Sequence, residues 1–260
     1  MSLSSNFSLD FFDLDGKVAI VTGGNTGIGM AYAEALATAG ANLFVTTFDD
    51  NIQEVKKNVE ALGRKIVFVK GDLTNDEFRN EVVESCLKEY GKIDILVNNA
   101  GTIRRSPLLE YKSEDWDAVM NINLNAVYYL SQKVAKVMIE QKSGKIINIA
   151  SMLSFQGGKF VPPYTASKHG VAGITKAFAN ELAEHNVQIN AIAPGYIKTA
   201  NTAPIRADEN RNKEILDRIP ANRWGEVSDL MGTVVFLASK ASDYVNGHVL
   251  AVDGGWLVRW

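Results

Sequence analysis

Two side chains that could move a proton stand four positions apart in this sequence. Tyr164 and Lys168 share one face if the segment is helical, because residues four apart are neighbours on a helix surface. A phenol with a reference pKa of about 10 is a poor base at neutral pH, and an adjacent ammonium favours the phenolate. Lowering that pKa by about three units requires about 4 kcal/mol, much of which one cation in a partly dry site can supply. The pair is a candidate acid–base group, and an exposed Tyr–Lys pair on a helix is the plain alternative.

Ser151 is a candidate for holding the oxygen that exchanges this proton. It ends the strand pattern of Lys145–Ile149, and an ordinary turn serine is the alternative reading. Such chemistry requires no metal, and the three histidines, His169, His185 and His248, show no ligand spacing. The sequence therefore predicts proton transfer at a bound oxygen without a metal site.

A glycine cluster follows the apolar run Val18–Val21. Within Thr22–Gly29, Gly23 would allow a tight turn, Gly27 would let the backbone approach a pyrophosphate, and Gly29 would let a helix pack closely on a strand. The amino end of that helix would face the phosphates with unpaired N–H groups. Three residues separate Gly23 from Gly27, which departs from the common G-x-G-x-x-G spacing, and a glycine cluster alone could be only a turn.

The elements that must position these residues alternate along the chain. Short β-branched runs predict strands at Val18–Val21, Leu43–Val45, Ile66–Val69, Ile95–Val97, Lys145–Ile149, Val187–Ile192 and His248–Val252. Longer patterns between them predict helices at Ala31–Ala39, Ile52–Leu62, Asp76–Tyr90, Ser113–Glu140, Ala166–His185 and Asp229–Ala238. This alternation predicts right-handed βαβ units in an α/β fold with a doubly wound parallel sheet. Without a linker or an internal repeat, we expect residues 1–260 to form one domain.

The polar segment Thr199–Arg223 interrupts the alternation. It follows Pro194-Gly195 and separates two strands more widely than a plain crossover requires. Long insertions in compact domains are usually functional or disordered, so we expect a lid over the strand ends, with a surface helix as the alternative.

Four motifs occur in a fixed order: T-G-x-x-x-G-x-G at Thr22–Gly29, N-N-A-G at Asn98–Gly101, Y-x-x-x-K at Tyr164–Lys168, and Pro194-Gly195. In this order the chain resembles the short-chain dehydrogenase/reductase family from about Lys17 to Trp256. The resemblance implies a Rossmann-type fold that binds a nicotinamide cofactor and transfers hydride between an alcohol and a carbonyl.

The resemblance also assigns residues. It implies the catalytic set Asn123, Ser151, Tyr164 and Lys168, in which Asn123 holds a water and relays protons. Asn121, two residues earlier, is the alternative residue for this position. It implies cofactor contacts from Gly23, Asn25, Thr26, Gly27, Ile28, Gly29, Thr47, Phe48, Asp72, Leu73, Asn99, Ala100, Gly101, Tyr164, Lys168, Pro194, Ile197 and Thr199.

Which nicotinamide cofactor binds is a question of charge. A 2′-phosphate requires Arg or Lys in the glycine loop or near the end of the second strand. There is no basic residue between Gly23 and Gly29 or from Thr46 to Gln53. The usual acidic position is Thr47, followed by Phe48, so NAD is favoured over NADP mainly because no phosphate partner is present.

Cations near the expected strand ends indicate an anionic substrate. Arg104 and Arg105 follow the N-N-A-G motif, Lys198 follows Pro194-Gly195, and Arg206 lies in the expected lid. Arginine can hold a carboxylate through two hydrogen bonds, although each could be a solvated loop residue. The predicted substrate contacts are Arg104, Arg105, Ser151, Gln156, Tyr164 and Arg206.

Further strings resemble the members of the family that act on keto sugar acids: Met152–Gly158, Ala193–Tyr196, Arg206–Glu209, Ile215–Pro220, Arg223–Gly225 and Asp243–Gly247. They imply NAD(H)-dependent interconversion of 2,5-didehydro-3-deoxy-D-gluconate and 2-dehydro-3-deoxy-D-gluconate in uronic-acid breakdown. Gluconate 5-dehydrogenases share several strings and are the nearest alternative. A 3-oxoacyl-carrier-protein reductase is a more distant one, and a catalytically silent dinucleotide-binding regulator is an alternative of another class.

Composition limits the partners. The chain has 260 residues, a net charge of −3 and one cysteine, Cys86. We therefore expect no nucleic-acid partner, which usually demands a basic face, and a reducing, cytoplasmic compartment. Residues 1–15 lack the features of a secretory signal, and no apolar run approaches the roughly 20 residues needed to span a bilayer. The family resemblance implies a homotetramer.

Overall fold

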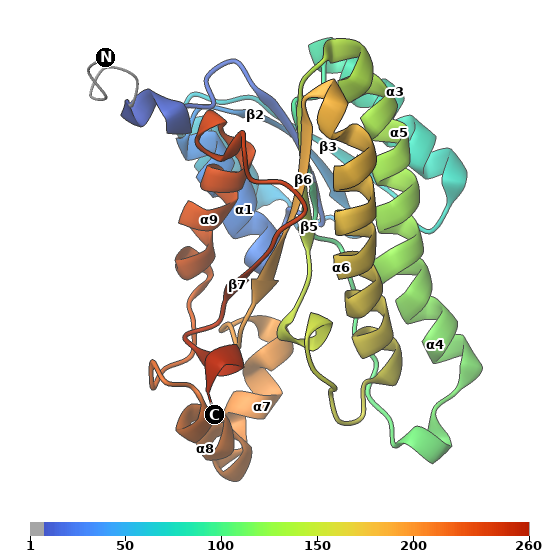
Figure 1. The fold of residues 1–260 in the computed structure, drawn as a ribbon, viewed down its shortest axis with the longest axis vertical. Coiled ribbons are helices and arrows are strands. Elements are labelled where there is room, and N and C mark those ends of the chain that lie inside the picture. The colour runs from blue at the N-terminus through green and yellow to red at the C-terminus, as the bar shows by residue number, and fades with distance from the viewer. Residues whose placement is uncertain (1–7, 260) are drawn as a thin grey trace.

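A seven-stranded sheet runs through the centre of the computed structural model, which describes residues 8–259 (Figure 1). Its strands lie in the order β3-β2-β1-β4-β5-β6-β7, and all neighbours are parallel. The strands are β1 (Val18–Thr22), β2 (Asn42–Thr47), β3 (Ile66–Lys70), β4 (Ile95–Asn98), β5 (Gly144–Ile149), β6 (Val187–Pro194) and β7 (Val249–Val252). The expected doubly wound parallel sheet is confirmed.

The central strands are apolar because helices cover both of their faces. β1, β5 and β6 are buried along their whole length, as is usual in parallel sheets of this class. Successive residues of a strand point to opposite faces, and β1 divides accordingly. Ala19 and Val21 belong to one apolar core, whereas Val18 and Ile20 belong to the other.

Helices form a layer on each side of the sheet (Figure 1). One core is closed by α1 (Gly27–Thr38), α2 (Gln53–Ala61) and α9 (Met231–Ala238). The other is closed by α3 (Asp76–Tyr90), α5 (Ala126–Gln141) and α6 (Pro162–Leu182). Among residues 8–259, every helix is too short or too polar to cross a bilayer.

Two helices begin earlier than the sequence pattern predicts. α1 starts at Gly27 rather than Ala31, because the glycine loop leads directly into the first helical turn. α6 starts at Pro162 rather than Ala166, since proline is favourable at the first helical position, where its missing N–H costs nothing. Tyr164 is therefore already part of α6.

The helix expected at Ser113–Glu140 is interrupted. α4 (Ser113–Met120) and α5 are joined by a π-helical turn over Asn121–Asn125, in which the amide of Ala126 donates to the carbonyl of Asn121. A π turn holds one residue more than an α turn and is common at functional sites. Asn123 lies at its centre.

The segment expected to form a lid folds into short helices at the end of the molecule where the C-terminus also lies (Figure 1). α7 (Ala203–Ala207) and α8 (Glu209–Arg218) follow a 3-10 turn at Ala200–Thr202. Ile215 of α8 packs in a small apolar cluster with Met152, which directly follows Ser151, and with Trp256. The segment thus contacts the loop after β5.

The strand order reverses beside β1. The chain runs from β1 outward to β2 and β3, and then returns to the other side of β1 to form β4. Open α/β sheets bind ligands at the carboxyl ends of the strands next to such a switch point. The predicted site residues follow the ends of β1, β4, β5 and β6.

Candidate active site

The glycine loop between β1 and α1 folds tightly over the sheet. Gly23 has a φ of +59°, and its amide donates to the carbonyl of Thr46 over 2.9 Å. A Cβ at Gly29 would clash with the carbonyl oxygen of Gly23 and with Nδ2 of Asn99, so only glycine fits there. Gly27 has a φ of +54°, and a Cβ on it would meet no atom within 4 Å. Gly23 makes the turn, Gly29 allows the close packing, and Gly27 borders open space.

The amino end of α1 opens into that space. Thr26 precedes the helix without making a side-chain capping bond, and the first turn contains no acidic residue. The N–H groups around Gly27 and Ile28 therefore keep their partial positive charge for a ligand. Asn25 instead donates to Asp49 Oδ1 over 2.8 Å and to the carbonyl of Asn51, which anchors the loop to the end of β2. This helix end fits the pyrophosphate of a dinucleotide.

The ends of β2 and β3 lie side by side next to the glycine loop. Thr47 is buried and Phe48 is 76% exposed. Lys70 lies opposite Thr47 in the parallel register, and its Nζ lies 2.7 Å from Oδ2 of Asp50. A search for basic residues between Thr46 and Gln53 could not find Lys70, because only the folded sheet brings it there.

The residues after β3 complete this edge of the site. The amide of Gly71 donates to the carbonyl of Thr47 over 3.0 Å, which holds the two strand ends together. Asp72 is exposed, and its Oδ1 accepts a hydrogen bond from the amide of Thr74. Leu73 is buried beneath it.

The N-N-A-G motif after β4 supports the glycine loop from behind. Thr22 Oγ1 accepts hydrogen bonds from the amides of Asn99 and Ala100, both over 2.9 Å. Asn99 Nδ2 donates to the carbonyls of Thr22 and Gly23. At Gly101, a Cβ would lie 3.0 Å from Oδ1 of Asn123, which explains why a small residue stands there.

The structure brings Ser151, Tyr164 and Lys168 together. Lys168 Nζ lies 5.5 Å from the centroid of the Tyr164 ring and donates to the carbonyl of Ile149 over 2.6 Å. Ser151 is buried at the end of β5, where its Oγ accepts from the amide of Leu153 over 3.2 Å. Because that bond uses a lone pair of the oxygen, the hydroxyl proton of Ser151 stays available for another acceptor.

Burial dominates the ionisation of this group. It raises the pKa of the Tyr164 hydroxyl above its ordinary value, and hydrogen bonding with Ser151 and the charge of Arg105 partly offset that rise. Burial also lowers the pKa of Lys168 to about 8. The loop after β4 therefore contributes, through Arg105, a charge that favours the phenolate. This contribution of Arg105 could not be inferred from the spacing of Tyr164 and Lys168 in the sequence.

Asn123 connects this group to the loop after β4. Its Oδ1 accepts from the amide of Thr102 over 2.8 Å, and its Nδ2 donates to the carbonyl of Thr102 and to Oγ of Ser167. Ser167 Oγ in turn donates to the carbonyl of Tyr164 over 2.8 Å. These bonds use both Nδ2 protons of Asn123 and one of the two lone pairs of its Oδ1. The proton relay that the resemblance implies stays a prediction.

The three predicted substrate arginines have different surroundings. Arg104 Nη1 donates to Thr102 Oγ1 over 3.0 Å, and its Nε lies 3.7 Å from Oδ1 of Asp115, so this side chain is directed towards α4. Arg105 is exposed, and its charge acts on the hydroxyl of Tyr164. Arg206 donates to the carbonyl of Thr199, and its buried Nε has no partner within residues 8–259.

Gln156 is joined to a cation that the sequence reading did not select. Its Oε1 accepts from Nη2 of Arg218 over 3.2 Å. The Arg218 guanidinium also lies 4.0 Å from the centroid of the Trp256 ring. Since the oxygen of Gln156 is used, its Nε2 protons are left as donors, which suits a substrate oxygen.

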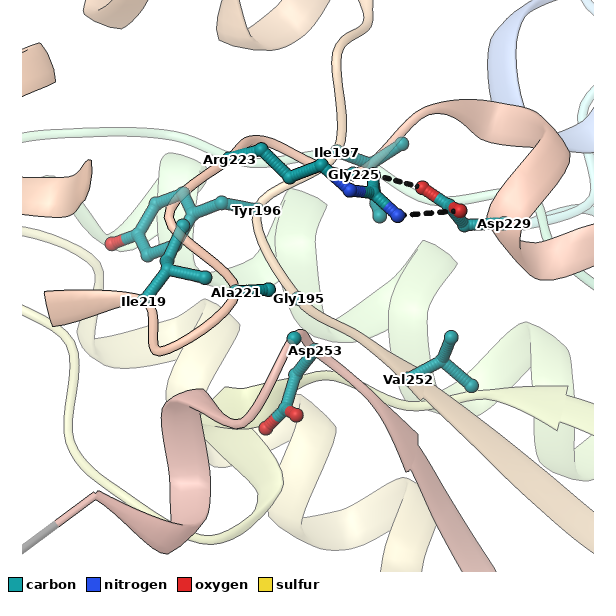
Figure 2. A pocket seen from close by; sticks show the side chains of 11 residues that line it. Gly195, Tyr196, Ile197, Ile219, Ala221, Arg223, Gly225, Asp229, Val252 and Asp253 are labelled. Atoms are coloured by element: carbon teal, nitrogen blue, oxygen red, sulfur yellow. Dashed lines mark hydrogen bonds and ion pairs between the residues drawn. The ribbon is translucent and has the colours of Figure 1, made fainter.

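The turn after β6 borders a cavity of about 180 Å³, shown in Figure 2. The amide of Gly195 donates to the carbonyl of Val252, and Ile197 is buried in a short bridge to Gly225. Eleven residues line the cavity: Gly195, Tyr196, Ile197, Ile219, Ala221, Arg223, Gly225, Asp229, Val252, Asp253 and Gly254. Arg223 and Asp229 pair with each other over 2.6 and 2.9 Å, and neither Ser151 nor Tyr164 reaches the wall. We therefore place the chemistry outside this cavity.

The structure thus gathers most predicted residues at the carboxyl ends of the strands, where a partly buried phenol, a buried ammonium and a serine follow β5 and an open helix end follows β1. The sequence reading missed Thr22, Ser154, Ser167, Lys70 and Arg218. Thr22 opens the glycine motif and could have been found there. The other four act through contacts between distant segments and carry no signal in the sequence.

Comparison with known proteins gives the ancestry of this arrangement. The family model described as "Enoyl-(Acyl carrier protein) reductase" matches residues 23–257. The chain is 55% identical over 252 residues to 2-dehydro-3-deoxy-D-gluconate 5-dehydrogenase from Escherichia coli K12, covering 96% of this chain and 99% of that protein. It is 43% identical over 252 residues to 5-keto-D-gluconate 5-reductase of the same organism, covering 96% and 98%.

A solved structure extends the likeness to three dimensions. The crystal structure of a gluconate 5-dehydrogenase from Burkholderia cenocepacia, in complex with NADP and tartrate, superposes with a TM-score of 0.93. The two chains are 37% identical, and the match covers 98% of this chain and 100% of the other.

Proposed function

Because the chain belongs to the short-chain dehydrogenase/reductase family, we propose that it interconverts 2,5-didehydro-3-deoxy-D-gluconate and 2-dehydro-3-deoxy-D-gluconate in uronic-acid breakdown, using NAD(H). The proposal is carried by the meeting of Ser151, Tyr164 and Lys168 at the carboxyl end of β5, at the same edge of the sheet as the amino end of α1, which is suited to a pyrophosphate. The substrate is inferred from the relative that is 55% identical over nearly the whole chain.

The catalytic roles follow from the hydrogen bonds of each group. A bound nicotinamide would supply or accept the hydride. Ser151 donates its hydroxyl proton to the carbonyl oxygen, since the Leu153 amide orients the serine oxygen and the hydroxyl lies within hydrogen-bonding reach of Tyr164. Tyr164 protonates that oxygen during reduction and takes the proton back during oxidation. The ammonium of Lys168 and the guanidinium of Arg105 favour the phenolate that remains.

For the substrate carboxylate, Arg105 is the strongest of the three predicted arginines. Arg104 is directed towards Asp115, and Arg206 donates to the lid backbone, whereas Arg105 acts on the Tyr164 hydroxyl. A charge-assisted pair contributes about 1.5–3 kcal/mol, so Arg105→Ala should lower kcat/KM for the acid by about ten- to a hundredfold. A neutral keto sugar should lose only the part that comes from the effect of Arg105 on Tyr164, so the additional loss for the acid measures the carboxylate contact. Arg104→Ala is the matched control. Equal losses for acid and neutral substrates would remove Arg105 from this role.

We propose that NADH is preferred over NADPH. The carboxylates of Asp49 and Asp50 lie at the end of β2, and Asp50 pairs with the nearby cation Lys70. An exposed Phe48, rather than a basic residue, follows Thr47. The Burkholderia relative was crystallised with NADP, so the ratio of kcat/KM values for the two cofactors is the measurement that matters. If kcat/KM with NADH is equal to or lower than kcat/KM with NADPH, the proposed preference is wrong.

One set of assays separates the functions. Initial rates are measured with 2,5-didehydro-3-deoxy-D-gluconate, 5-ketogluconate and an acetoacetyl thioester, each with NADH and NADPH. We expect the highest kcat/KM for the deoxy acid. A higher value for 5-ketogluconate would favour a gluconate 5-dehydrogenase, and for the thioester an acyl-carrier-protein reductase. Cofactor binding without turnover of any carbonyl compound would indicate a regulator.

Three further proposals concern the whole molecule. We propose that residues 1–260 form one domain in which Thr199–Arg223 acts as a lid, supported by the contact of Ile215 with Met152. We also propose a cytoplasmic homotetramer, supported by the single cysteine and by the exposed aromatic side chains of Trp116 and Tyr129 on α4 and α5. Light scattering after size exclusion tests the tetramer.

A further inference from the structure

Ser154 bonds to the main chain on both sides of the reacting group. Its Oγ accepts from the amide of Ser151 over 3.3 Å and donates to the carbonyl of Lys168 over 2.7 Å. Lys168 Nζ also donates to the carbonyl of Ile149 over 2.6 Å. These bonds close a circuit between the end of β5 and α6, which we call the serine circuit: Ile149, Ser151, Ser154 and Lys168. All four residues are buried.

We propose that Ser154 is a positioning residue for the reaction, one that sets where the Ser151 hydroxyl stands relative to Tyr164 and Lys168. The inference rests on the proposed oxidoreductase function. The Ser154 hydroxyl does not take part in the proton transfer itself. It acts by fixing the main chain of two residues whose side chains do.

The two bonds of Ser154 constrain different parts of the site. The bond to the Ser151 amide holds the 3-10 turn Met152–Ser154, and the same turn supplies the Leu153 amide that orients the Ser151 hydroxyl. The bond to Lys168 holds the backbone of the helix, while Ile149 holds the far end of the lysine side chain. Lys168 is therefore fixed at both ends, with its ammonium beneath the Tyr164 ring.

A helix cap alone does not account for this arrangement. The capping box at this turn requires only that Ser154 accept from Ser151. The donated proton instead goes to a carbonyl fourteen residues away, on another element. Without the hydroxyl, the buried Ser151 amide lacks an acceptor, and the turn must shift to find another. Displacements of about 1 Å in a reacting group can lower turnover about a hundredfold.

The first experiment compares three variants of the full-length enzyme. Ser154→Ala removes both bonds, and Ser154→Thr keeps the hydroxyl. Ser131→Ala is the control, because Ser131 on α5 is also buried but accepts from Asn98 at the end of β4 rather than from Ser151. We expect Ser154→Ala to lower kcat by about ten- to a hundredfold, with KM for NADH within about threefold of the wild type. Ser154→Thr should recover most of the loss.

The pH profile of kcat adds a readout that lost stability alone would not move. Because the circuit holds Lys168 beside Tyr164, Ser154→Ala should displace the apparent pKa in this profile, whereas Ser131→Ala should leave it in place. If Ser154→Ala does not fold, Ser154→Cys serves instead, since its thiol is a weaker donor, and its kcat should fall between those of the wild type and Ser151→Ala. An unchanged kcat and pH profile in folded Ser154→Ala, or in folded Ser154→Cys where the alanine variant does not fold, overturns the inference.

A double-mutant cycle then tests whether Ser154 acts through Ser151. In a Ser151→Ala background, Ser154→Ala should lower kcat by a clearly smaller factor than in the wild type, because one of the two groups that it positions is already gone. A full additional loss in that background would refute the positioning role. If the wild type reduces no keto sugar acid, the proposed substrate is wrong, and the same cycle is run with a carbonyl compound that it does reduce. The two failures are therefore distinguishable.

Discussion

Replacing Lys168 with methionine should change how the stability of the protein depends on pH. Burial lowers the pKa of Lys168 from 10.5 to about 8 in the folded protein, so its protonated form is disfavoured there. Below about pH 8 both states carry the proton, and the folded state bears the full cost of the buried charge. As pH rises from 8 towards 10.5, the folded protein has lost the proton that the unfolded chain still binds. The free energy of unfolding therefore rises with pH over this range.

The magnitude follows from the two pKa values. A difference of about 2.5 pKa units corresponds to about 3 kcal/mol, of which about 2 kcal/mol is recovered between about pH 7 and pH 9.5. Lys168→Met has no proton to lose, so the stability of the wild type relative to this variant should rise by about 2 kcal/mol over that interval. Groups that do not contact Lys168 titrate equally in both proteins and cancel in the difference.

Urea denaturation at fixed protein concentration, repeated across this pH interval, measures the effect. Lys176→Met is the matched control, because Lys176 lies on the same helix and is exposed. Its stability should follow that of the wild type in parallel. If the difference between the wild type and Lys168→Met is the same at both ends of the interval, the ammonium of Lys168 is not the buried, easily deprotonated group inferred here.

Three other substitutions test separate parts of the site, and a fourth, Gly173→Ala, is the control for the glycine replacement. Tyr164→Phe should fold and bind NADH but lose at least about a hundredfold in kcat, as expected for a positioned acid–base group, and near-normal turnover would exclude it as the proton donor. Phe48→Arg should raise kcat/KM with NADPH relative to NADH, and an unchanged ratio would place the 2′ position of the ribose elsewhere. Gly29→Ala should weaken cofactor binding at least about tenfold, measured by fluorescence titration, because its Cβ would clash with Gly23 and Asn99. Gly173→Ala, in a helix with open space around it, should be neutral or stabilising by about 0.5–1 kcal/mol.

All seven strands could be predicted from the sequence because each reads as a short apolar run rich in β-branched residues, whether it is buried throughout, as β1, β4, β5 and β6 are, or partly exposed at an edge of the sheet, as β3 and β7 are. Helix limits were less certain where glycine or proline begins a helix, as at Gly27 and Pro162, since propensity alone argues against both residues. The π turn at Asn121–Asn125 was not foreseen, because its sequence continues a helical pattern without a break. It is set by the bonds between Asn123 and Thr102, which belong to tertiary structure.

The catalytic side chains were found by motif, whereas the groups that hold them were not. Tyr164 and Lys168 lie on one helix, so their spacing already implies proximity. Ser154 matters through a hydrogen bond to a carbonyl on α6, and any serine in a turn would look the same in the sequence. Lys70 shows the limit of a local search, since a parallel register joins it to Thr47 from another strand.

The π turn also makes the length of the α4–α5 stretch a fixed quantity. Each residue of an α-helix turns the chain by about 100°, so removing one residue from Asn121–Asn125 would rotate α4 relative to α5 by about that angle. Because Leu130 and Val134 hold α5 in the core, α5 would stay in place, and α4 and Asn123 would rotate instead. The additional residue of the π turn thus determines which face of α4 is directed towards the core when α5 is in place. A single-residue deletion here would turn the outward face of α4, including Trp116, towards new neighbours without shortening any strand.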